Sequence, residues 1–385
     1  MIYPLKNFPV NWVDGMKISK DHFIDSDKHF TDLVRDAIST RITAHNFGLL
    51  PPIQGETDYI NLKFSENGGN GAKVEMNYCN AITPGGFRIQ IDTRNENSYL
   101  TCEAKNLLDN ANSSETNLFN IVLVANPYQR TPKGEPSLEE NPPRHPYTGV
   151  KYHLEIMNSE QVKAGELGPY FFVVGRIVNK GGMLSLDESY IPPSTSINSH
   201  PQLQNFYAEC IKTFKNVHQN ALSVVKKIHL KSNPSPLATN FSEVCTKVLA
   251  FIAQNNFALK NEIPEQPPIK LISLMSSLAG LVHTSLECMH PEEKEELLKY
   301  IYEWSSLSPG DLDRTLLNTI NIDYDHYNIK ASLTTVNACM ETLISIWGKM
   351  DTLEFIGQKK ENVVLSSQTI QQQAKQTVKK LNIFD

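Results

Sequence analysis

Apolar and polar residues alternate with a period of two through most of the first half of the chain. Seven short runs carry this pattern: "YINLKFS", "AKVEMNY", "FRIQI", "SYLTCEA", "NIVLVANPY", "YHLEIM" and "YFFVVGRIV". They are rich in β-branched and aromatic residues. Turn-forming segments such as "GGNG", "PGG", "KGEP", "NPPRHP" and "NKGG" separate many of them. Many short strands at this spacing predict an antiparallel sandwich or barrel over roughly residues 55–186.

The start of the chain follows a different period. Between Asp21 and Phe47 the apolar residues recur at helical spacing. They are Phe23, Phe30, Leu33, Val34, Ala37, Ile38, Ile42 and Ala44. We therefore expect a turn that leads into a helix, and we expect this helix to pack beside the sheet domain.

After Pro192 and Pro193 the period changes to 3.6. One long apolar stripe predicts a helix. Its members are Leu203, Phe206, Tyr207, Cys210, Ile211, Phe214, Val217, Ala221, Val225 and Ile228. Further helices are predicted from about Phe241, over 269–286, from "HPEEKEELLKYIYEW" and over 333–347. Short proline-containing connections between them are typical of antiparallel neighbours in a bundle.

The predicted fold class is therefore α+β and multidomain. Residues 1–197 would form an N-terminal arm, a helix and an antiparallel β-sandwich, and residues 198–350 a helical bundle. Beyond Met350 the chain becomes polar and rich in Ser and Gln. We expect residues 351–385 to form a tail that is too poor in apolar residues to bury a core of its own.

Composition narrows the class of protein. The chain has 385 residues, 40% of them hydrophobic and 20% charged, and a net charge of −6. This acidic balance gives no footprint for nucleic acid and no polybasic anchor for lipid. No secretory signal and no uninterrupted apolar stretch long enough to span a bilayer are visible. The six cysteines are scattered, as in reduced core thiols, so we expect a cytosolic protein.

The segment "WVDGMKISKDHFIDSDKH", residues 12–29, is dense in titratable groups. His22 and His29 lie seven residues apart and share a helical face, but Asp25 and Asp27 cannot both join them. No H-E-x-x-H pattern and no nearby cysteine supports a metal. The alternative is a capped helix start, which we favour, so we predict no bound metal.

Other candidate motifs favour structure over chemistry. "GGNGAK" lacks the ending of a phosphate loop, and no G-x-S-x-G elbow occurs. "YDHYN" at Tyr324 is interpreted as a helix entry with Asp325 as its N-cap. Acids cluster in runs such as "EEKEE", which are typical of solvated faces. Paired carboxylates for glycoside hydrolysis stay open, because their separation is spatial. We predict no catalytic residue, no cofactor and no enzymatic activity.

Three stretches, in this order, resemble TssK, the baseplate subunit of type VI secretion systems. The first is "VNWVDGMKISKDHFIDSDKHF", whose matching residues are Trp12, Asp14, Gly15, Met16, Ile18, His22, Phe23 and Asp27. The second, "GRIVNKGGMLSLDESYIPPSTSI", resembles the exit of the family's β domain. Its matching residues include Arg176, Asp187, Tyr190, Pro192 and Pro193. The third comprises "PPIKLISLMSSLAGLVHTSL" and "NIDYDHYNIKASLTTV".

The resemblance implies a β-sandwich shoulder, a helical neck that forms a homotrimer, and a C-terminal head. It implies a non-enzymatic adaptor that docks on the TssF–TssG wedge and links the baseplate to proteins of the membrane complex. Its place would be cytoplasmic, at the inner face of the bacterial inner membrane. The matching residues of the first two stretches would be structural or interaction residues, with the first fixing the arm against the domain or a neighbouring subunit.

The chain departs from the family at its end. The family continues with a compact domain after the helix that ends here near Trp347, whereas only residues 351–385 follow in this chain. A reduced head would suit a divergent system with other membrane-complex components. Two other classes stay open: a phage-tail-like trimeric adhesin that binds carbohydrate, and a carbohydrate-active enzyme.

Overall fold

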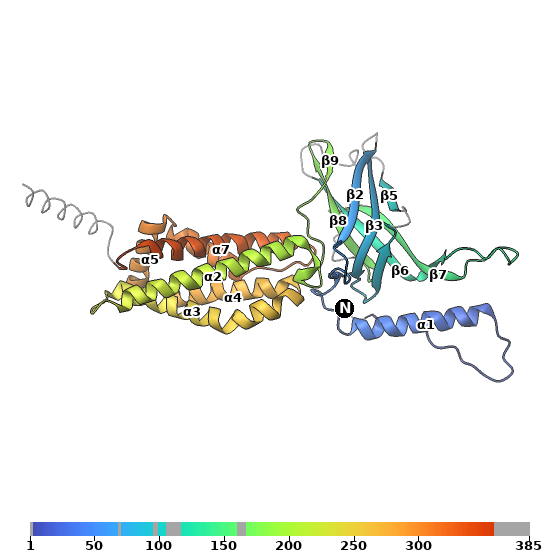
Figure 1. The fold of residues 1–385 in the computed structure, drawn as a ribbon, viewed down its shortest axis with the longest axis horizontal. Helices are drawn as coiled ribbons and strands as arrows, with labels where there is room; N and C mark the ends of the chain where they lie inside the picture. Colours follow the sequence, from blue (N-terminus) through green and yellow to red (C-terminus); the bar gives the residue numbers. More distant parts are fainter. Residues whose placement is uncertain (1–2, 68–70, 95–98, 105–116, 160–166, 358–385) are drawn as a thin grey trace, which may run out of the picture. The chain divides into compact units, whose positions relative to one another are not determined.

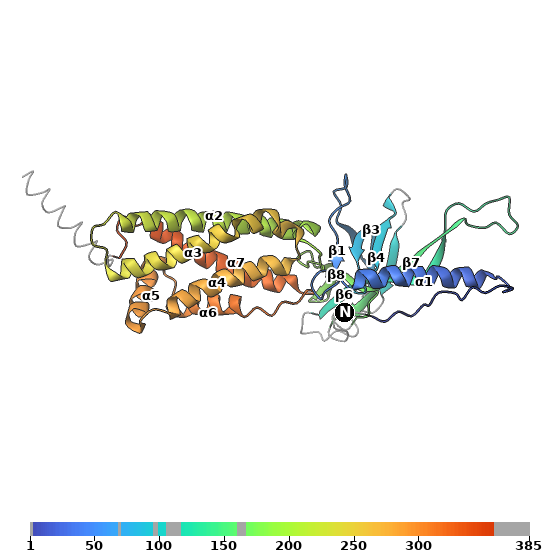
Figure 2. The same cartoon turned by 90° about the horizontal axis from the view of Figure 1, so that it is seen from below.

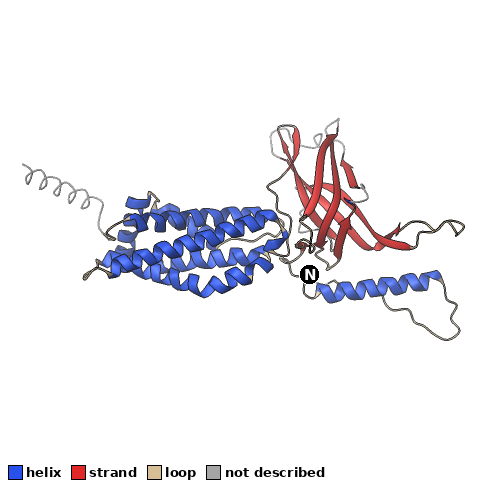
Figure 3. Cartoon of the chain, in the orientation of Figure 1, coloured by secondary structure: helices blue, strands red, loops and turns tan. Residues whose placement is uncertain are grey.

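The chain forms two compact units in the computed structural model, which describes residues 3–67, 71–94, 99–104, 117–159 and 167–357. Unit 1 comprises residues 1–205, and it also includes the short segments 263–270 and 324–331. Unit 2 comprises residues 206–262, 271–323 and 332–385. The strands of the described residues belong to unit 1, and long helices make up unit 2 (Figure 3). The predicted α+β class is confirmed.

Unit 1 contains two antiparallel sheets (Figure 1). The five-stranded sheet is formed by β1 (Gly48–Leu49), β2 (Ile60–Asn67), β3 (Gly71–Ile82), β4 (Arg88–Asp92) and β5 (Leu100–Ala104). Strand β3 pairs with each of the other four. The four-stranded sheet, in the order β7-β6-β8-β9, is formed by β6 (Asn117–Lys133), β7 (Tyr147–Asn158), β8 (Phe171–Lys180) and β9 (Met183–Leu186).

The core of unit 1 is built from the inward-facing residues of both sheets. Val74 and Met76 of β3 belong to the same buried cluster as Ile121 and Leu123 of β6. The alternation that predicted the strands is thus the alternation between this core and the outer faces. Two predicted turns are confirmed as hairpin connections: "PGG" lies between β3 and β4, and Gly181-Gly182 between β8 and β9. Most of "GGNG" lies outside the described residues.

Unit 2 is a helical array. Its elements are α2 (Pro201–His229), α3 (Pro236–Asn261), α4 (Pro268–Glu287), α5 (Pro291–Ser305), α6 (Pro309–Ile320) and α7 (Ile329–Thr352). The helices α2 to α6 each begin with proline, whose fixed φ suits the first turn and whose missing N–H would have no helical partner there. The Ser235 and Ser308 hydroxyls accept N-terminal N–H groups of α3 and α6.

Two helix predictions need correction. Helix α3 begins at Pro236, five residues before the predicted start, because Ser235 and Pro236 supply the N-cap and first turn. Helix α6 was not predicted, although Leu312, Leu316 and Ile320 recur at helical spacing, and Leu312 and Leu316 are buried. Helix α4 is long and apolar enough to cross a membrane, but Leu271, Met275 and Leu278 are buried inside the protein. That burial is the behaviour of a core helix.

The segment 324–331, which precedes and begins α7, packs within unit 1. The His326 side chain is buried, with Nε2 2.9 Å from the Phe47 carbonyl and Nδ1 2.8 Å from the Tyr324 hydroxyl. Burial lowers the pKa of His326 to about 4. The predicted capping role of Asp325 is wrong: its carboxylate accepts the Tyr327 N–H in a turn, and α7 begins at Ile329.

The first residues of the predicted tail pack on unit 2. Ile356 is buried, and the Lys227 ammonium donates to the carbonyls of Asp351, in the last turn of α7, and Leu353, just beyond it. The Gly357 N–H donates to the Tyr300 hydroxyl at 3.0 Å. These contacts favour the alternative in which the start of the tail closes the helical array. Residues 358–385 lie outside the described residues.

Candidate interaction surface

The N-terminal arm and helix α1 (Lys20–Ser39) form a hairpin, which we call the arm–helix hairpin (residues 3–39). Figures 1 and 2 show α1 beside the strands of unit 1. Gly15 lies in the turn that joins the arm to the helix, with φ of 78°, and Met16 N–H donates to Val13 O. A positive φ at this turn position favours glycine, which explains the Asp-Gly-Met sequence.

The first histidine of the dense segment caps α1. His22 Nδ1 accepts the Ser19 N–H at 3.0 Å, as the third helical residue does in a capping box. The Trp12 ring packs against His22 and Phe23, with centroids 5.9 and 6.3 Å apart. Four of the predicted residues, Trp12, Gly15, His22 and Phe23, thus form the tip of the hairpin, and they fix the arm on α1.

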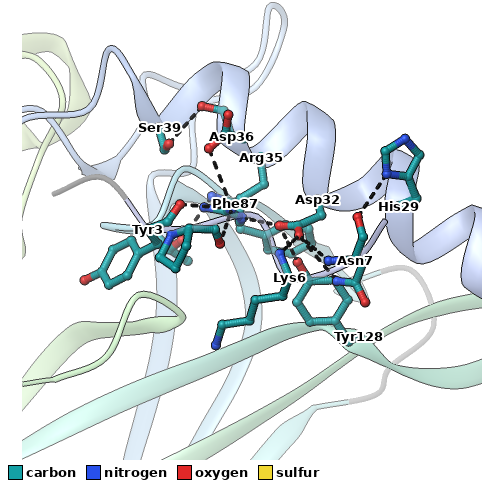
Figure 4. A network of polar contacts seen from close by, with 12 residues as sticks. Tyr3, Lys6, Asn7, His29, Asp32, Arg35, Asp36, Ser39, Phe87 and Tyr128 are labelled. Atoms are coloured by element: carbon teal, nitrogen blue, oxygen red, sulfur yellow. Dashed lines mark hydrogen bonds and ion pairs between the residues drawn. The ribbon is translucent and has the colours of Figure 1, made fainter. Parts of the chain in front are cut away.

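A buried polar cluster holds the hairpin on the sheet domain (Figure 4). We call it the polar clamp, and it comprises Lys6, Asn7, Asp32, Arg35 and Tyr128. One carboxylate oxygen of Asp32 accepts the backbone N–H groups of Lys6 and Asn7 at 2.6 and 3.0 Å. The other accepts from Arg35 Nε at 2.8 Å and from the Tyr128 hydroxyl of β6 at 2.9 Å.

The clamp stabilises the charged form of its carboxylate. Burial raises the pKa of Asp32, but the hydrogen bonds from Lys6, Asn7, Arg35 and Tyr128 outweigh burial and hold this pKa well below its usual range. Burial and the contact with Asp32 raise the pKa of Tyr128, so its hydroxyl stays a donor. The Asp32–Arg35 pair is almost fully buried and therefore depends on these partners.

The polar clamp sets the orientation of α1. The buried residues of this helix are Asp32, Arg35 and Ser39, whereas Phe23 and Phe30 are each 60% exposed. Leu33 and Val34 are also exposed. At 100° per residue, Phe30 lies about 160° from Asp32 around the helix. The helix packs beside the sheet domain as predicted, and it does so with its polar face. The helix also ends at Ser39, so Ile42 and Ala44 lie beyond it.

A groove continues the apolar face of α1. It has a volume of about 380 Å³ and lies between α1 and the β3–β4 turn. Phe30, Val34 and Ile38 line it from the helix, and Phe87 lines it from the turn. The exposed apolar face of α1 together with this groove is the candidate interaction surface.

The second group of predicted residues lies elsewhere in unit 1 and is buried. Tyr190 packs under the Arg176 guanidinium, 4.5 Å from the ring centroid, and the Pro193 carbonyl accepts the Leu49 N–H at 2.8 Å. Pro192 is buried as well. A Cβ on Gly48 would lie 2.0 Å from the Pro193 carbonyl oxygen, so this approach requires glycine. Tyr190, Pro192 and Pro193 thus support the fold.

Comparison with known proteins gives a fold and no sequence family. No family model and no curated protein matches the chain. A chain of the TssK–TssF–TssG baseplate subcomplex of the type VI secretion system matches with a TM-score of 0.50 and 16% identity, covering 88% of this chain and 99% of that one. The chain resembles TssK in fold.

Two further solved structures give weaker matches. The crystal structure of TssK matches at a TM-score of 0.47 and 14% identity, over 75% of this chain, which spans 63% of that protein's length. A chain of the type VI baseplate complex matches at a TM-score of 0.47 and 16% identity, over 82% of this chain and 99% of that one. The likeness in fold is taken from the matching chain of the TssK–TssF–TssG subcomplex. The predicted resemblance to TssK is confirmed at the level of fold.

The tip of the hairpin has a clear local signal in the sequence, whereas the clamp has only a weak one. The turn follows from the Asp14-Gly15 pair. The N-cap follows from Ser19, because the acceptor side chain of His22 comes three residues later. Asp32, Arg35 and Tyr128 were not predicted. Asp32 and Tyr128 lie 96 residues apart, and only the fold brings them together. A possible signal was the presence of two charged residues, three apart, within an apolar helical pattern.

Two groups bear on metal binding. His22 is engaged by Ser19, and His29 Nδ1 lies 3.0 Å from the Asn7 carbonyl oxygen, so both side chains have structural partners. In unit 2, donor atoms of His283, Glu287 and Asp313 lie within 4.8 Å of one another. Glu287 also pairs with the Lys294 ammonium, and both carboxylates are about half exposed. Because the Lys294 ammonium already pairs with Glu287, we interpret these three residues as part of a surface ion-pair cluster.

Proposed function

We propose that the protein is a non-enzymatic structural subunit of a type VI secretion baseplate. The similarity to a chain of the TssK–TssF–TssG subcomplex carries this proposal, because it extends over 88% of this chain and includes both the sheets and the helices. The titratable residues of the N-terminal segment serve capping and clamping, which suits a protein that positions surfaces. Its place in the cell would be the cytoplasmic side of the secretion machine.

Docking on the TssF–TssG wedge is the central part of this proposal. Co-expression with the TssF- and TssG-type proteins of the same secretion gene cluster tests it. We expect a complex that survives size-exclusion chromatography and gives a cryo-EM map with this fold at its periphery. A protein that elutes alone, while the TssF- and TssG-type proteins elute together, would contradict the proposal.

We also propose that the protein is a homotrimer through its helical unit. A groove of about 600 Å³ between α2 and α3 supports this, since Ile211, Ile252 and Leu259 line it beside Lys215 and Lys260. Leu222 and Phe257 are exposed on the same two helices. Val224, which lies near Leu222 beside the apolar stripe of α2, is buried within the protein and gives no support. Analytical ultracentrifugation distinguishes a trimer from a monomer at micromolar concentration.

The link to the membrane complex is a further proposal. We assign it to the part of the predicted tail after Gly357, since residues 351–357 contact unit 2. A chain stopped after Gly357 should still form the wedge complex but should fail in secretion. Normal secretion by this truncated chain would contradict the assignment. A carbohydrate-binding adhesin is the competing class, and specific binding on a glycan array would favour it.

A further inference from the structure

Strands β6 and β7 and the loop between them form a two-stranded extension of unit 1, which we call the β6–β7 ribbon (residues 129–148) (Figure 1). All of these residues are exposed except Ser137, which is partly exposed. Lys133 and Tyr147 pair across the ribbon, and a further bridge joins Ser137 to Arg144 near its tip. A two-stranded ribbon with both faces in solvent is at best marginally stable on its own, which favours a partner.

The tip of the ribbon carries an exposed leucine next to an acid. Leu138 is 85% exposed. The ion pair at the tip joins Arg144 to Glu140 at 2.8 Å, which leaves Glu139 without an ion-pair partner among the described residues. Residues 133–145 have a net charge of −1 with His145 neutral, because three acids outweigh two bases. These charged residues are Lys133, Glu135, Glu139, Glu140 and Arg144.

The groove between α1 and the β3–β4 turn combines its apolar walls with arginine. Arg88 lines this groove, and its Nη1 donates to the carbonyls of Ala81 at 3.2 Å and Ile89 at 2.5 Å. Both acceptors are uncharged, so the charge of Arg88 is not neutralised by them. Arg130 lies beside the groove, since it donates to Thr31 Oγ1 at 3.3 Å and Thr31 is one of the lining residues.

The acids near the groove leave it positive. Asp32 pairs with Arg35 at 2.8 Å, and Asp36 lies 3.9 Å from Arg35 Nη2 but about 160° from Val34 around the helix. Asp27 shares the face of the groove, yet it lies eight residues, or about 12 Å, before Arg35. Three arginines at the groove against two acids give a net charge of +1. They are Arg35, Arg88 and Arg130 against Asp32 and Asp36.

The ribbon does not reach the groove of its own copy. Arg130 touches the groove at Thr31, and from there the ribbon continues for eight residues to Leu138, up to about 26 Å at 3.3 Å per residue. Figures 1 and 2 both show the connection between β6 and β7 apart from α1. One chain therefore carries an acidic tip with an exposed leucine and a basic apolar groove that it cannot bring together, whereas two copies can.

We propose that the tip of the β6–β7 ribbon docks in the α1 groove of a second copy of this chain. Leu138 would lie against Val34 and Phe87, and the Glu139 carboxylate would accept from Arg88. Tip and groove are different patches, so the contact is heterologous and closes into a ring when it repeats around a three-fold axis. The inference rests on the proposed homotrimer, and it adds the segment and the site that join neighbouring copies.

Cross-linking between two differently tagged copies tests this contact. Both copies carry Cys288→Ser, because Cys288 is an exposed thiol. One copy also carries Leu138→Cys and the other Val34→Cys, and the assembly is purified through both tags. We expect a short bismaleimide to give a covalent product that contains both tags. Met183→Cys replaces Leu138→Cys in the control, since Met183 is 71% exposed in the same unit, and it should give only the background of the Cys288→Ser chains.

The outcomes separate this inference from the homotrimer. Copies that co-purify without giving the product would overturn the inference and leave the homotrimer standing. An equal yield with Met183→Cys would also overturn it, because chance collision would then explain the product. Copies that do not co-purify would contradict the homotrimer itself and the docking with it.

Charge reversal in the same pair of copies tests the ion pair. Glu139→Arg is placed in the copy with the ribbon cysteine, and Arg88→Glu in the copy with the groove cysteine. We expect either reversal alone to lower the cross-linked yield and both together to restore it. Glu188→Arg, at an exposed position of the same unit, is the control for Glu139→Arg and should leave the yield unchanged.

Folding does not confound this test. Glu139 is exposed and makes no ion pair among the described residues, so Glu139→Arg should keep the circular dichroism and melting temperature of the parent chain. A yield that stays unchanged with Glu139→Arg, or that stays low when both reversals are present, would overturn the inference.

Discussion

Helices α1 and α2 have similar amphipathic patterns but opposite orientations. The long helix α2 buries its apolar stripe, including Phe214, Val217 and Ala221. Helix α1 buries Asp32, Arg35 and Ser39 and exposes Phe23 and Phe30. The difference lies in what each helix meets: α2 packs among apolar side chains, whereas α1 meets the Tyr128 hydroxyl and the backbone of the arm. Periodicity thus identifies two faces of a helix, and the packed neighbours decide which face is buried.

The largest effect is expected for a charge on the buried stripe of α2. Phe214→Asp should lower the free energy of unfolding by about 3–5 kcal/mol, because the carboxylate would be buried without a partner. Urea denaturation measures this. Gln219→Asp, at an exposed position of the same helix, adds the same charge and should change stability little. A similar loss for both variants would mean that net charge is responsible and burial is not.

The next effect concerns the polar clamp. Asp32→Asn should remove the closest ion-pair partner of the buried Arg35 guanidinium and leave only the longer contact with Asp36, at a cost of about 3 kcal/mol. Faster hydrogen exchange at Lys6 and Asn7 should reveal detachment of the arm, and urea denaturation should give the change in stability. Asp27→Asn removes an exposed carboxylate from the same helix and is the control. Unchanged exchange at Lys6 and Asn7 in Asp32→Asn would contradict the clamp.

The pH dependence of the clamp has a defined sign. The pKa of Asp32 is lower in the folded state than its ordinary value of about 4, so its stabilisation is fully present above that value. It is lost as pH falls from about 4 toward the lowered pKa of the folded state. Slow exchange at Lys6 and Asn7 should therefore persist from neutral pH to about pH 4. In contrast, the stability contributed by neutral His326 should decline as pH falls from about 6.5 to about 4.

A smaller effect is expected from shortening the chain at the end of α7. A chain stopped after Met350 loses buried Ile356 and the carbonyls that receive Lys227, so its stability should fall by about 2 kcal/mol. A chain stopped after Gly357 keeps these contacts and is the control. Thermal unfolding compares the two. Equal melting temperatures would mean that residues 351–357 do not stabilise unit 2.

The smallest effect on stability is expected on the outer face of α1. Phe23→Asp should change the free energy of unfolding by less than about 0.5 kcal/mol, because the side chain is already 60% exposed. A loss as large as that of Phe214→Asp would mean that the stripe is buried in solution, and the contrast between the two helices would then be wrong.

Much of the architecture was predictable from local pattern. Alternation predicted the sheets, because a strand of a sandwich has one face in the core and one face outward. The 3.6 period predicted most helices of unit 2, and Pro291 with Glu292 and Glu293 marked the start of α5. Helix α6 was missed because it is short, although its apolar residues recur at helical spacing. Asp325 was misassigned because a turn and a helix cap use the same side-chain hydrogen bond.

The sequence by itself determined the alternation of the strands, the 3.6-residue period of the helices, the turn at Gly15 and the cap at Ser19. Each of these depends on residues close together in the chain. Only the tertiary structure decided the orientation of α1, the burial of Tyr190, Pro192 and Pro193, and the place of segment 324–331 within unit 1. Each of these depends on partners far away in sequence, such as Tyr128 for Asp32 and Phe47 for His326. A buried ion pair is stable only where several such partners converge, and no local pattern encodes that convergence.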